Sequence, residues 1–312
     1  MMFKLVSIFL LLNVAVIAQD KTYNDPFIII LGIAQDAGYP QAGCEKDCCK
    51  RVLTDASAKR MVTSLALADP ATHQWWLFDA TPDITAQLQL FRSKTNAAYP
   101  ILPAGIFLTH GHIGHYTGLM YFGREAMNTR SLPVYAMSRM NGFLVQNGPW
   151  DQLFEINNLS MRRLRADSSV NLSTGITVTP FLVPHRDEYS ETVGFSIQYQ
   201  QFKLIYIPDI DKWKKFGRDI NLLVKESSVA LLDGTFFKDG ELAGRAMNEI
   251  PHPFVEESML QFSTLAEADK KKIHFIHLNH TNPLLDKKSV PFAEIKKKGF
   301  NIAEQGEKVV FR

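Results

Sequence analysis

Short apolar segments with strand-like composition recur along the whole chain, and segments with helical spacing separate several of them. The strand-like segments are 27–31, 74–78, 105–109, 175–183, 192–199, 202–207, 229–232, 273–278 and 308–311. Apolar residues recur at helical spacing at 81–91 and again after His115. These strands are too many for a simple Rossmann sheet, so we expect an α/β fold in which two packed sheets are flanked by helices.

Composition indicates one ordinary globular domain. The 312 residues are 46% hydrophobic and 21% charged, which excludes collagen-like, coiled-coil and disordered chains. The formal net charge is +2, and no stretch gathers enough Lys and Arg to follow a phosphate backbone, so nucleic acid is not an expected partner. No linker, low-complexity tract or internal repeat divides the chain. We therefore expect a single domain over residues 19–312.

The first 18 residues have the pattern of a signal peptide. Lys4 precedes a mostly apolar run from Leu5 to Ala18, and small side chains at its end make an acceptable cleavage site before Gln19. The run is shorter than the roughly 20 apolar residues of a membrane span. We expect an exported protein, periplasmic or extracellular, with no membrane span in the mature chain. A retained amphipathic anchor is the alternative.

Six of the nine histidines lie in two short windows of the sequence, which chance would rarely produce. These are His110, His112 and His115 in the first window, and His274, His277 and His280 in the second. The first window follows an apolar strand and enters a helix, at the kind of sheet edge where α/β folds bind ligands. Clustered neutral imidazoles favour zinc, and a zinc site with an open position activates water. The alternative is a polar loop with incidental histidines.

The segment from His110 to His115 resembles the H-x-H-x-D-H motif of the metallo-β-lactamase fold family. His185, Asp209 and His277 follow in the family's order, each at the end of a strand-like segment. Within that family the chain is most similar to the pyrroloquinoline-quinone biosynthesis protein B group, and the phosphodiesterases of phosphonate breakdown are similar in layout. The segments that carry this resemblance are 38–41, 80–84, 183–188, 232–236 and 277–283.

The resemblance implies a four-layer αββα sandwich with a metal site at one edge of its two sheets. The family's roles, carried over residue by residue, assign His110, His112 and His185 to the first metal, Asp209 to a bridging position, and His115 and His277 to the second metal. They imply an exported metal-dependent hydrolase in which metal-bound hydroxide attacks an ester, phosphodiester or similar bond of a small-molecule substrate. Asp209 and His277 are the expected catalytic residues, with one or two Zn²⁺ ions as cofactor.

One position departs from the family motif, because Gly114 replaces the aspartate and has no side chain to coordinate a metal. Binding of a carboxylate to a divalent cation depends strongly on charge, so the second metal should bind more weakly than the first. Three outcomes are open: the chain works with one metal, it recruits another carboxylate such as Asp187 or Asp36, or it has lost hydrolysis and kept binding. We favour an active enzyme with two unequal sites.

Two other function classes compete with hydrolysis. The pyrroloquinoline-quinone group is associated with iron-dependent oxidation of a peptide-derived tyrosine, which implies an oxidase or hydroxylase of a small aromatic or peptide substrate as an alternative. Imidazole and carboxylate ligands suit iron as well as zinc. A non-catalytic metal-binding module is the third interpretation, and Gly114 is its support. A nucleotide cofactor is not expected, because the chain has no G-x-G-x-x-G motif.

The three cysteines form a second predicted metal site. Cys44, Cys48 and Cys49 are the only cysteines in the chain, and an odd number cannot form a complete set of disulfides. Three thiolates need a fourth ligand to complete a structural zinc site, and His280 is the candidate. The related phosphodiesterases have a similar site, although their cysteine spacing is C-x-C-x-x-C. The alternatives are one disulfide with a free thiol, and a His280 that is only a hydrogen-bonded loop residue.

A few polar residues at strand ends have weaker functional claims. Asp79 resembles the family's acidic residue that orients the metal-binding loop, although a plain turn residue is the alternative. Asp233 is either a turn former or a partner of a metal ligand, and His252 lies between two prolines and could reach the site. Substrate-facing candidates, which could equally be a solvated loop, are Arg186, Asp187, Glu188 and Tyr189.

Overall fold

The computed structural model describes residues 25–173, 175–242, 244, 246–247 and 250–312. The predicted signal peptide at 1–18 lies outside the described residues, and its boundary stays a prediction. Among the residues that the structure does describe, no helix is long and apolar enough to cross a membrane.

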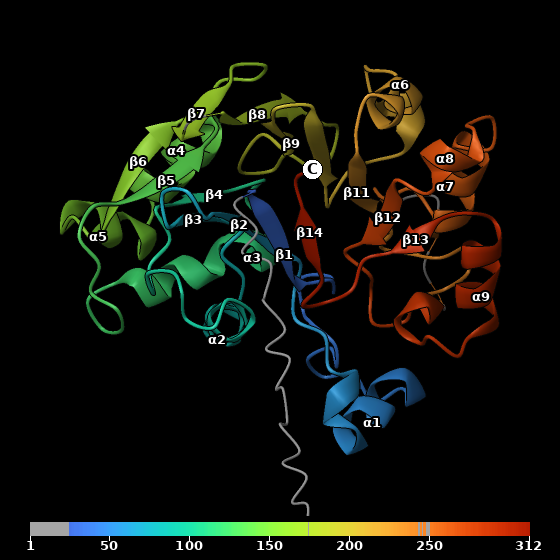
Figure 1. Cartoon of the computed structure of the whole chain (residues 1–312). Helices are drawn as coiled ribbons and strands as arrows, with labels where there is room; N and C mark the ends of the chain where they lie inside the picture. The colour runs from blue at the N-terminus through green and yellow to red at the C-terminus, as the bar shows by residue number, and fades with distance from the viewer. Residues whose placement is uncertain (1–24, 174, 243, 245, 248–249) are drawn as a thin grey trace, which may run out of the picture.

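Two seven-stranded sheets form the centre of the molecule (Figure 1). In spatial order, the first sheet contains β14 (Lys308–Val310), β1 (Phe27–Gly32), β2 (Ser64–Asp69), β3 (Gln74–Phe78), β4 (Gly105–Phe107), β5 (Leu132–Ala136) and β6 (Leu159–Arg163). The second contains β13 (Asn301–Ile302), β12 (Ile273–Ile276), β11 (Val229–Asp233), β10 (Phe202–Ile207), β9 (Val193–Tyr199), β8 (Ile176–Leu182) and β7 (Val170–Ser173). Both sheets mix parallel and antiparallel pairs.

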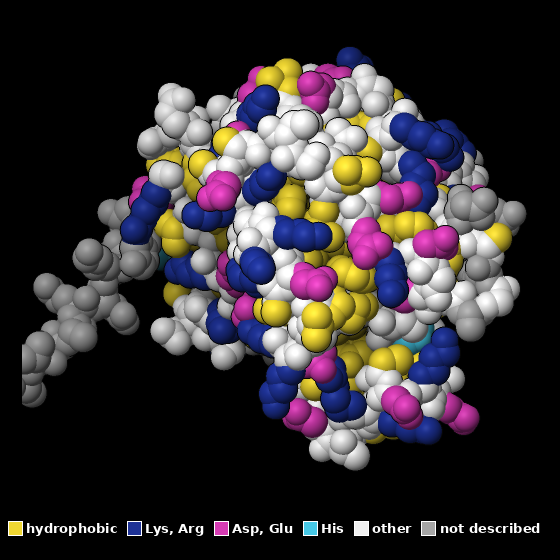
Figure 2. Space-filling view, turned by 90° about the vertical axis from the view of Figure 1, so that its right-hand side faces the viewer, with side chains coloured by type: hydrophobic (Ala, Val, Ile, Leu, Met, Phe, Trp, Pro, Cys, Tyr) yellow, Lys and Arg dark blue, Asp and Glu magenta, His cyan; other side chains and the backbone are white. Residues whose placement is uncertain are grey.

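Helices lie beside each sheet, in two sets (Figure 1). One set, from the first half of the chain, lies beside the first sheet, and the other, from the second half, lies beside the second sheet. The first set is α2 (Ile84–Lys94), α3 (Ile113–Tyr116), α4 (Ser138–Gln146) and α5 (Trp150–Glu155). The second set is α6 (Ile220–Lys225), α7 (Val255–Gln261), α8 (Glu267–Lys270) and α9 (Val290–Lys297). One further helix, α1 (Asp47–Thr54), projects from the sandwich, and Figure 2 shows it as a smaller lobe below the main body.

Strands β1 and β3 of the first sheet are buried on both faces, and this explains why their sequences are apolar almost throughout. In β1, Ile28 and Ile30 belong to the core between the two sheets, whereas Ile29 and Leu31 belong to the core under the helices. Because strand side chains alternate between faces, a strand covered on both sides needs apolar residues at every position. The expected four-layer αββα sandwich is therefore confirmed.

Sequence patterns located most of the strands that carry predicted site residues but missed several others. β2, β5, β6 and β7 were not expected, since their segments mix small, polar and basic residues with few large apolar ones. β12 ends at Ile276, two residues earlier than expected, which leaves His277 just beyond the strand with φ +63°. The expected helix at 81–91 begins at Ile84, because Thr81 Oγ1 accepts a hydrogen bond from Asp83 N in the turn that precedes it.

We predict that His274 makes stability fall in mild acid. It lies in β12, and burial, assisted by Lys296, lowers its pKa to about 4. The unfolded chain, with an ordinary histidine pKa near 6.5, then binds more protons than the folded chain between these two values. Stability from this group is therefore complete above about pH 6.5 and is lost as the pH falls toward about 4.

Urea unfolding at pH 7, 6 and 5 measures this effect. The variant His274→Gln should show a shallower loss of unfolding free energy between pH 7 and 5 than the unmodified chain, because its side chain does not titrate. An unchanged slope would mean that other groups control the acid sensitivity.

Candidate metal centre

Strands from both sheets end at one edge of the sandwich and place their following residues around a common point. The polar residues there are Asp79 after β3, His110 after β4, His185 after β8, Asp209 after β10, Asp233 at the end of β11 and His277 after β12. Two of them, Asp79 and His277, have positive φ (+63° each), a conformation that non-glycine residues rarely adopt and that clusters at functional sites. Sequence reasoning placed all six at strand ends.

His110, His112 and His185 form the first group, with one ring nitrogen of each lying within 4.8 Å of the others. Their side chains are almost entirely buried; that of His112 is 13% exposed. His112 Nε2 lies 3.2 Å from Glu188 Oε2, so Nε2 donates to this carboxylate and the lone pair of the neutral ring is on Nδ1. The structure therefore brings together the three residues predicted for the first metal.

Asp36, His115 and His277 form the second group, and Asp209 lies between the two groups. Asp209 Oδ2 is 3.1 Å from His115 Nε2 and 3.2 Å from His277 Nε2, while its Oδ1 is 3.6 Å from His185 Nε2. Asp36 Oδ1 lies 3.2 Å from His115 Nε2 and 3.6 Å from His277 Nε2. Of the two carboxylates suggested for this site, Asp36 reaches it. Asp187 instead accepts a hydrogen bond from Thr192 Oγ1 and lies in none of these groups.

Asp79 and Thr109 orient two of the histidines. The fully buried Asp79 carboxylate accepts hydrogen bonds from Thr109 N (2.8 Å), Thr109 Oγ1 (3.0 Å) and His115 Nδ1 (2.8 Å). Because the Thr109 hydroxyl donates to Asp79, its oxygen accepts from His110 Nδ1 at 2.9 Å. Both imidazoles therefore carry their proton on Nδ1 and direct the Nε2 lone pair into the site.

Asp233 and Thr235 orient His252 and His277 on the opposite side of the site. Asp233 accepts hydrogen bonds from Ile210 N (3.0 Å), Thr235 Oγ1 (2.7 Å) and His252 Nδ1 (2.8 Å). The Thr235 oxygen is then free to accept from His277 Nδ1 at 2.9 Å, which directs His277 Nε2 into the site. Thr109 and Thr235 were missed by sequence reasoning, although Thr109 directly precedes His110 and Thr235 lies two residues after Asp233.

The atoms that face the centre are buried and have no hydrogen-bond partner. They are Nε2 of His110, His115, His185 and His277, Oδ1 of Asp36 and Oδ2 of Asp209. Buried polar atoms in folded proteins are nearly always satisfied, so a concentration of unsatisfied lone pairs at one point needs a cation or protons between them. This donor set of imidazoles and carboxylates fits zinc or another divalent transition metal.

Electrostatics within the centre are dominated by the carboxylates. Burial alone would lower the pKa of His115, but Asp79 and Asp209 raise it well above its ordinary value. Burial alone would raise the pKa of Asp209, but His277 and His115 hold it well below its usual range. Burial lowers the pKa of His185 to about 4. The carboxylates therefore favour positive charge at the centre.

The predicted cysteine site is also assembled. Sulfur atoms of Cys44, Cys48 and Cys49 and a ring nitrogen of His280 lie within 4.8 Å of one another, and none of the cysteines forms a disulfide. Cys49 is fully buried, and burial raises its pKa to about 12 in the absence of a cation. His280 Nδ1 is buried without a partner. Four donors at this spacing match a closed tetrahedral zinc site, in which metal would deprotonate the thiols.

The loop directly after His185, residues 186–189, is exposed. Arg186 and Tyr189 are exposed, and Arg186 Nη1 lies 3.8 Å from Glu188 Oε1. Arg139 holds this loop by donating from Nη2 to the Asp187 carbonyl at 2.7 Å. Of the four residues proposed to face substrate, Glu188 is the one that contacts the metal centre.

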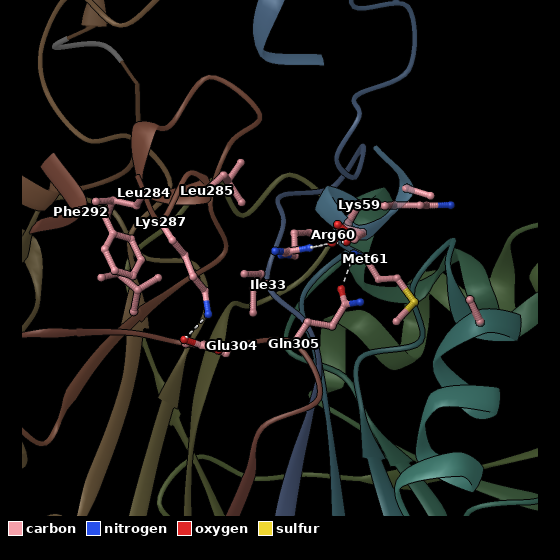
Figure 3. A pocket seen from close by; sticks show the side chains of 15 residues that line it. Ile33, Lys59, Arg60, Met61, Leu284, Leu285, Lys287, Phe292, Glu304 and Gln305 are labelled. Carbon is pink, nitrogen blue, oxygen red and sulfur yellow. Dashed lines mark hydrogen bonds and ion pairs between the residues drawn. The ribbon is translucent and has the colours of Figure 1, made fainter. Parts of the chain in front are cut away.

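A separate cavity of ≈ 460 Å³ lies away from the metal centre, between the segment after α1 and the C-terminal helices. In Figure 3, Arg60 and Met61 lie on one side of it and Leu284 and Phe292 on the other, with Ile33 between them. None of the predicted metal-binding residues lines this cavity. It therefore has no direct part in the chemistry of the centre.

Comparison with known proteins agrees with the fold. A family model for the beta-lactamase superfamily domain matches residues 74–277. Coenzyme PQQ synthesis protein B of Xanthomonas euvesicatoria pv. vesicatoria (strain 85-10) is 28% identical over 309 residues, which cover 89% of this chain and 98% of that protein.

Solved structures with the same fold include the Zn²⁺-bound PqqB from Methylobacterium extorquens, with a TM-score of 0.73 and 23% identity over 91% of this chain and 99% of that one. A diphosphatase from the PhnP family has a TM-score of 0.63 and 20% identity over 92% of this chain and 97% of that one. The sandwich, the strand-end donors and the match over 74–277 lead to one conclusion. The chain belongs to the beta-lactamase superfamily, has the metallo-β-lactamase fold and is similar to the PqqB proteins over most of its length.

Proposed function

We propose that this protein is a metal-dependent hydrolase that cleaves an ester or phosphodiester bond in a small-molecule substrate. The observation that carries the proposal is the set of buried, unpartnered imidazole and carboxylate atoms that converge at the edge of the two sheets. The diphosphatase with the same fold supports hydrolysis as the reaction class. The fold itself does not specify the substrate.

The residues divide into two ligand sets. His110, His112 and His185 would hold one ion, and His115, His277 and Asp36 would hold the other. Asp209 lies within reach of both sets. When bound, such ions lower the pKa of water and stabilise negative charge that develops on the scissile group. Asp79, Thr109, Asp233 and Thr235 keep the imidazoles in the tautomer and orientation that the ions require.

His252 is suited to give a proton to the leaving group. Its Nδ1 donates to Asp233 at 2.8 Å and lies 3.9 Å from Asp209 Oδ1, and a ring nitrogen lies within 4.8 Å of donor atoms of His185 and Asp209. Burial alone would lower the pKa of His252, but Asp233 raises it above the ordinary histidine value. The side chain is 6% exposed.

We predict that His252→Gln lowers the turnover of substrates with poor leaving groups. Loss of a general acid costs about 10²–10⁴-fold in rate. Substrates that release p-nitrophenol, whose leaving group needs little protonation, should be much less affected. Steady-state kinetics on a matched pair of alkyl and p-nitrophenyl phosphodiesters measures the difference.

Zinc content separates this role from a structural one, because His252→Gln should keep all of its metal. Equal losses with both leaving groups, or a loss of metal, would contradict the assignment of His252 as proton donor.

Metal analysis and hydrolysis assays test the function as a whole. Purified protein should contain divalent metal, lose hydrolysis of bis(p-nitrophenyl) phosphate or p-nitrophenyl esters after dialysis against a chelator, and regain it when zinc returns. The variant His110→Ala should lose metal from the centre and, with it, the hydrolytic activity. A centre that takes up no metal, or hydrolysis that is indifferent to chelation, would overturn the proposal.

An iron-dependent oxidation is a second candidate, supported by one observation. Two imidazoles and one carboxylate, from His115, His277 and Asp36, form the type of ligand set that non-haem iron oxygenases use. Similarity to a coenzyme PQQ synthesis protein over 89% of the chain is consistent with such chemistry. Iron as the resident metal, with oxygen consumption and no hydrolysis, would favour this candidate over the first.

We also propose that the protein is exported after cleavage of residues 1–18, a proposal that rests on the sequence alone. N-terminal sequencing of the protein recovered from its native compartment should begin at Gln19. A chain that keeps its first residues in the cytoplasm would contradict it.

A further inference from the structure

Asp36 fills the space that a side chain at position 114 would need, although the two residues are far apart in the sequence. Gly114 lies in the short helix α3, next to the ligand His115. A Cβ atom added to Gly114 would lie 2.3 Å from Asp36 Oδ1, 2.6 Å from Asp36 Cα and 2.9 Å from Asp36 Cβ. Real Cβ atoms essentially never show such contacts. A side chain at 114 and the observed Asp36 therefore exclude each other.

The backbone around Asp36 gives this side chain a defined position. Ile33 N and Ala34 N both donate to Met61 O at 2.9 Å, and Gln35 N donates to Leu278 O at 3.0 Å. Leu278 N in turn donates to Ile33 O at 2.7 Å, which ties the segment to the loop that follows His277. The segment before Asp36 is thus bonded on both sides, and the contact with Gly114 is not easily relieved by moving it.

The carboxylate has the surroundings of a metal ligand rather than of a surface acid. Its side chain is 25% exposed, and Oδ1 has no hydrogen-bond partner although it lies 3.2 Å from His115 Nε2 and 3.6 Å from His277 Nε2. Because His115 Nδ1 donates to Asp79 and His277 Nδ1 to Thr235, both Nε2 atoms meet Asp36 with a lone pair in the neutral rings. Three lone pairs that face one another are stable only around a cation or a proton.

We propose that Asp36 supplies the anionic ligand of the second divalent cation in place of an aspartate at position 114, and that Gly114 is required because Asp36 fills its side-chain space. The inference rests on the proposed metal centre and identifies how its second site is completed. The carboxylate that the family motif has in the helix after β4 is thus replaced by one in the segment after β1. Its charge lies next to the same two residues, His115 and His277.

Zinc binding by five variants tests this arrangement without an activity assay. The protein should bind about three zinc ions per chain, one at the cysteines and two at the centre. Asp36→Asn keeps the shape of the side chain and removes its charge. It should lower the affinity for the second ion of the centre by at least tenfold, since loss of a residue that only supports a metal ligand already lowers metal affinity about 10–100-fold. Chelator competition and elemental analysis measure the affinities. Asp187→Asn is the matched control and should bind zinc as the unmodified protein does.

Gly114→Ala should weaken the same ion, because its methyl group displaces Asp36. The decisive comparison is the double variant. The added methyl group still meets Cα and Cβ of residue 36 in Asp36→Ala, but the carboxylate that it would displace is absent there. Adding Gly114→Ala to Asp36→Ala should therefore cost much less affinity for the second ion than Gly114→Ala costs in the unmodified protein. Such non-additivity is expected when two substitutions act through one contact. Circular dichroism and the retained cysteine-bound zinc show that each variant is folded.

The outcomes separate this inference from the proposed function. Equal zinc affinity in Asp36→Asn and unmodified protein, with two ions at the centre, would overturn the role of Asp36 and leave the hydrolase proposal standing. Additive losses in the double variant would overturn the claim that Gly114 acts through Asp36. A centre that binds no zinc in any variant would overturn the proposed function itself.

Discussion

The variant Asp209→Asn should lose hydrolysis almost completely while keeping its fold. Asp209 is 3% exposed, and its two oxygens lie between His185 on one side and His115 and His277 on the other. Asparagine keeps the shape but removes the charge that both ligand sets share. Loss of a residue that only supports a metal ligand already costs about 10–100-fold in metal affinity or activity, so we expect the loss of this shared carboxylate to lower activity by more than about 100-fold.

Metal content distinguishes the cause of this loss. Asp209→Asn should lose metal from the centre but keep the zinc held by the cysteines, which serves as an internal control within the same chain. Asp211→Asn is the matched control, because Asp211 belongs to the same loop and pairs with Lys215 outside the ligand groups. An Asp209→Asn variant with full metal and normal turnover would show that the centre does not depend on this carboxylate.

Replacement of Cys49 by alanine should remove one zinc ion and unfold α1 locally. Cys49 is fully buried in the cluster with Cys44, Cys48 and His280, and it lies within α1. Structural zinc sites contribute apparent binding energies of about 10–16 kcal/mol to folding. Without that ion the lobe depends on weaker contacts, such as the hydrogen bond from Tyr39 Oη to Cys48 O at 2.8 Å and the ion pair of Arg51 with Asp286.

Elemental analysis and amide hydrogen exchange measure both effects. Exchange should accelerate across α1 in Cys49→Ala, while protection of the strands and the metal of the strand-end centre stay as in the unmodified protein. Leu53→Ala is the control in the same helix, since Leu53 is 72% exposed and outside the cluster. Recovery of the native protein with one disulfide, one free thiol and no zinc at this site would contradict the prediction.

The local sequence was enough to identify the fold and most of the centre. His110, His112 and His115 lie so close in the chain that a single strand end and the following turn bring them together. His185, Asp209 and His277 each follow an apolar run, and the resemblance to the metallo-β-lactamase fold family, in whose order they appear, assigned them to the centre. The metals, the reaction and export remain predictions.

Contacts between segments that are remote in the sequence could not be deduced in the same way. Asp36 and Asp187 were equal candidates for the missing carboxylate, because nothing in their neighbouring residues indicates which one reaches His115. The bonds of the segment before Asp36 to Met61 and Leu278 decide the matter, and they depend on the packing of the two sheets. The hydroxyls of Thr109 and Thr235 can accept hydrogen bonds from ligand histidines because they donate to Asp79 and Asp233. These contacts also depend on the tertiary structure.

By itself, the sequence determined the types of donor and the strand ends that present them, because apolar alternation and short spacing are properties of neighbouring residues. The tertiary structure alone decided that Asp36 fills the space above Gly114. It also decided which nitrogen of each imidazole faces the centre. The physical reason is that both depend on distances of a few ångströms between segments joined only by sheet packing, and such distances leave no mark on the spacing of residues along the chain.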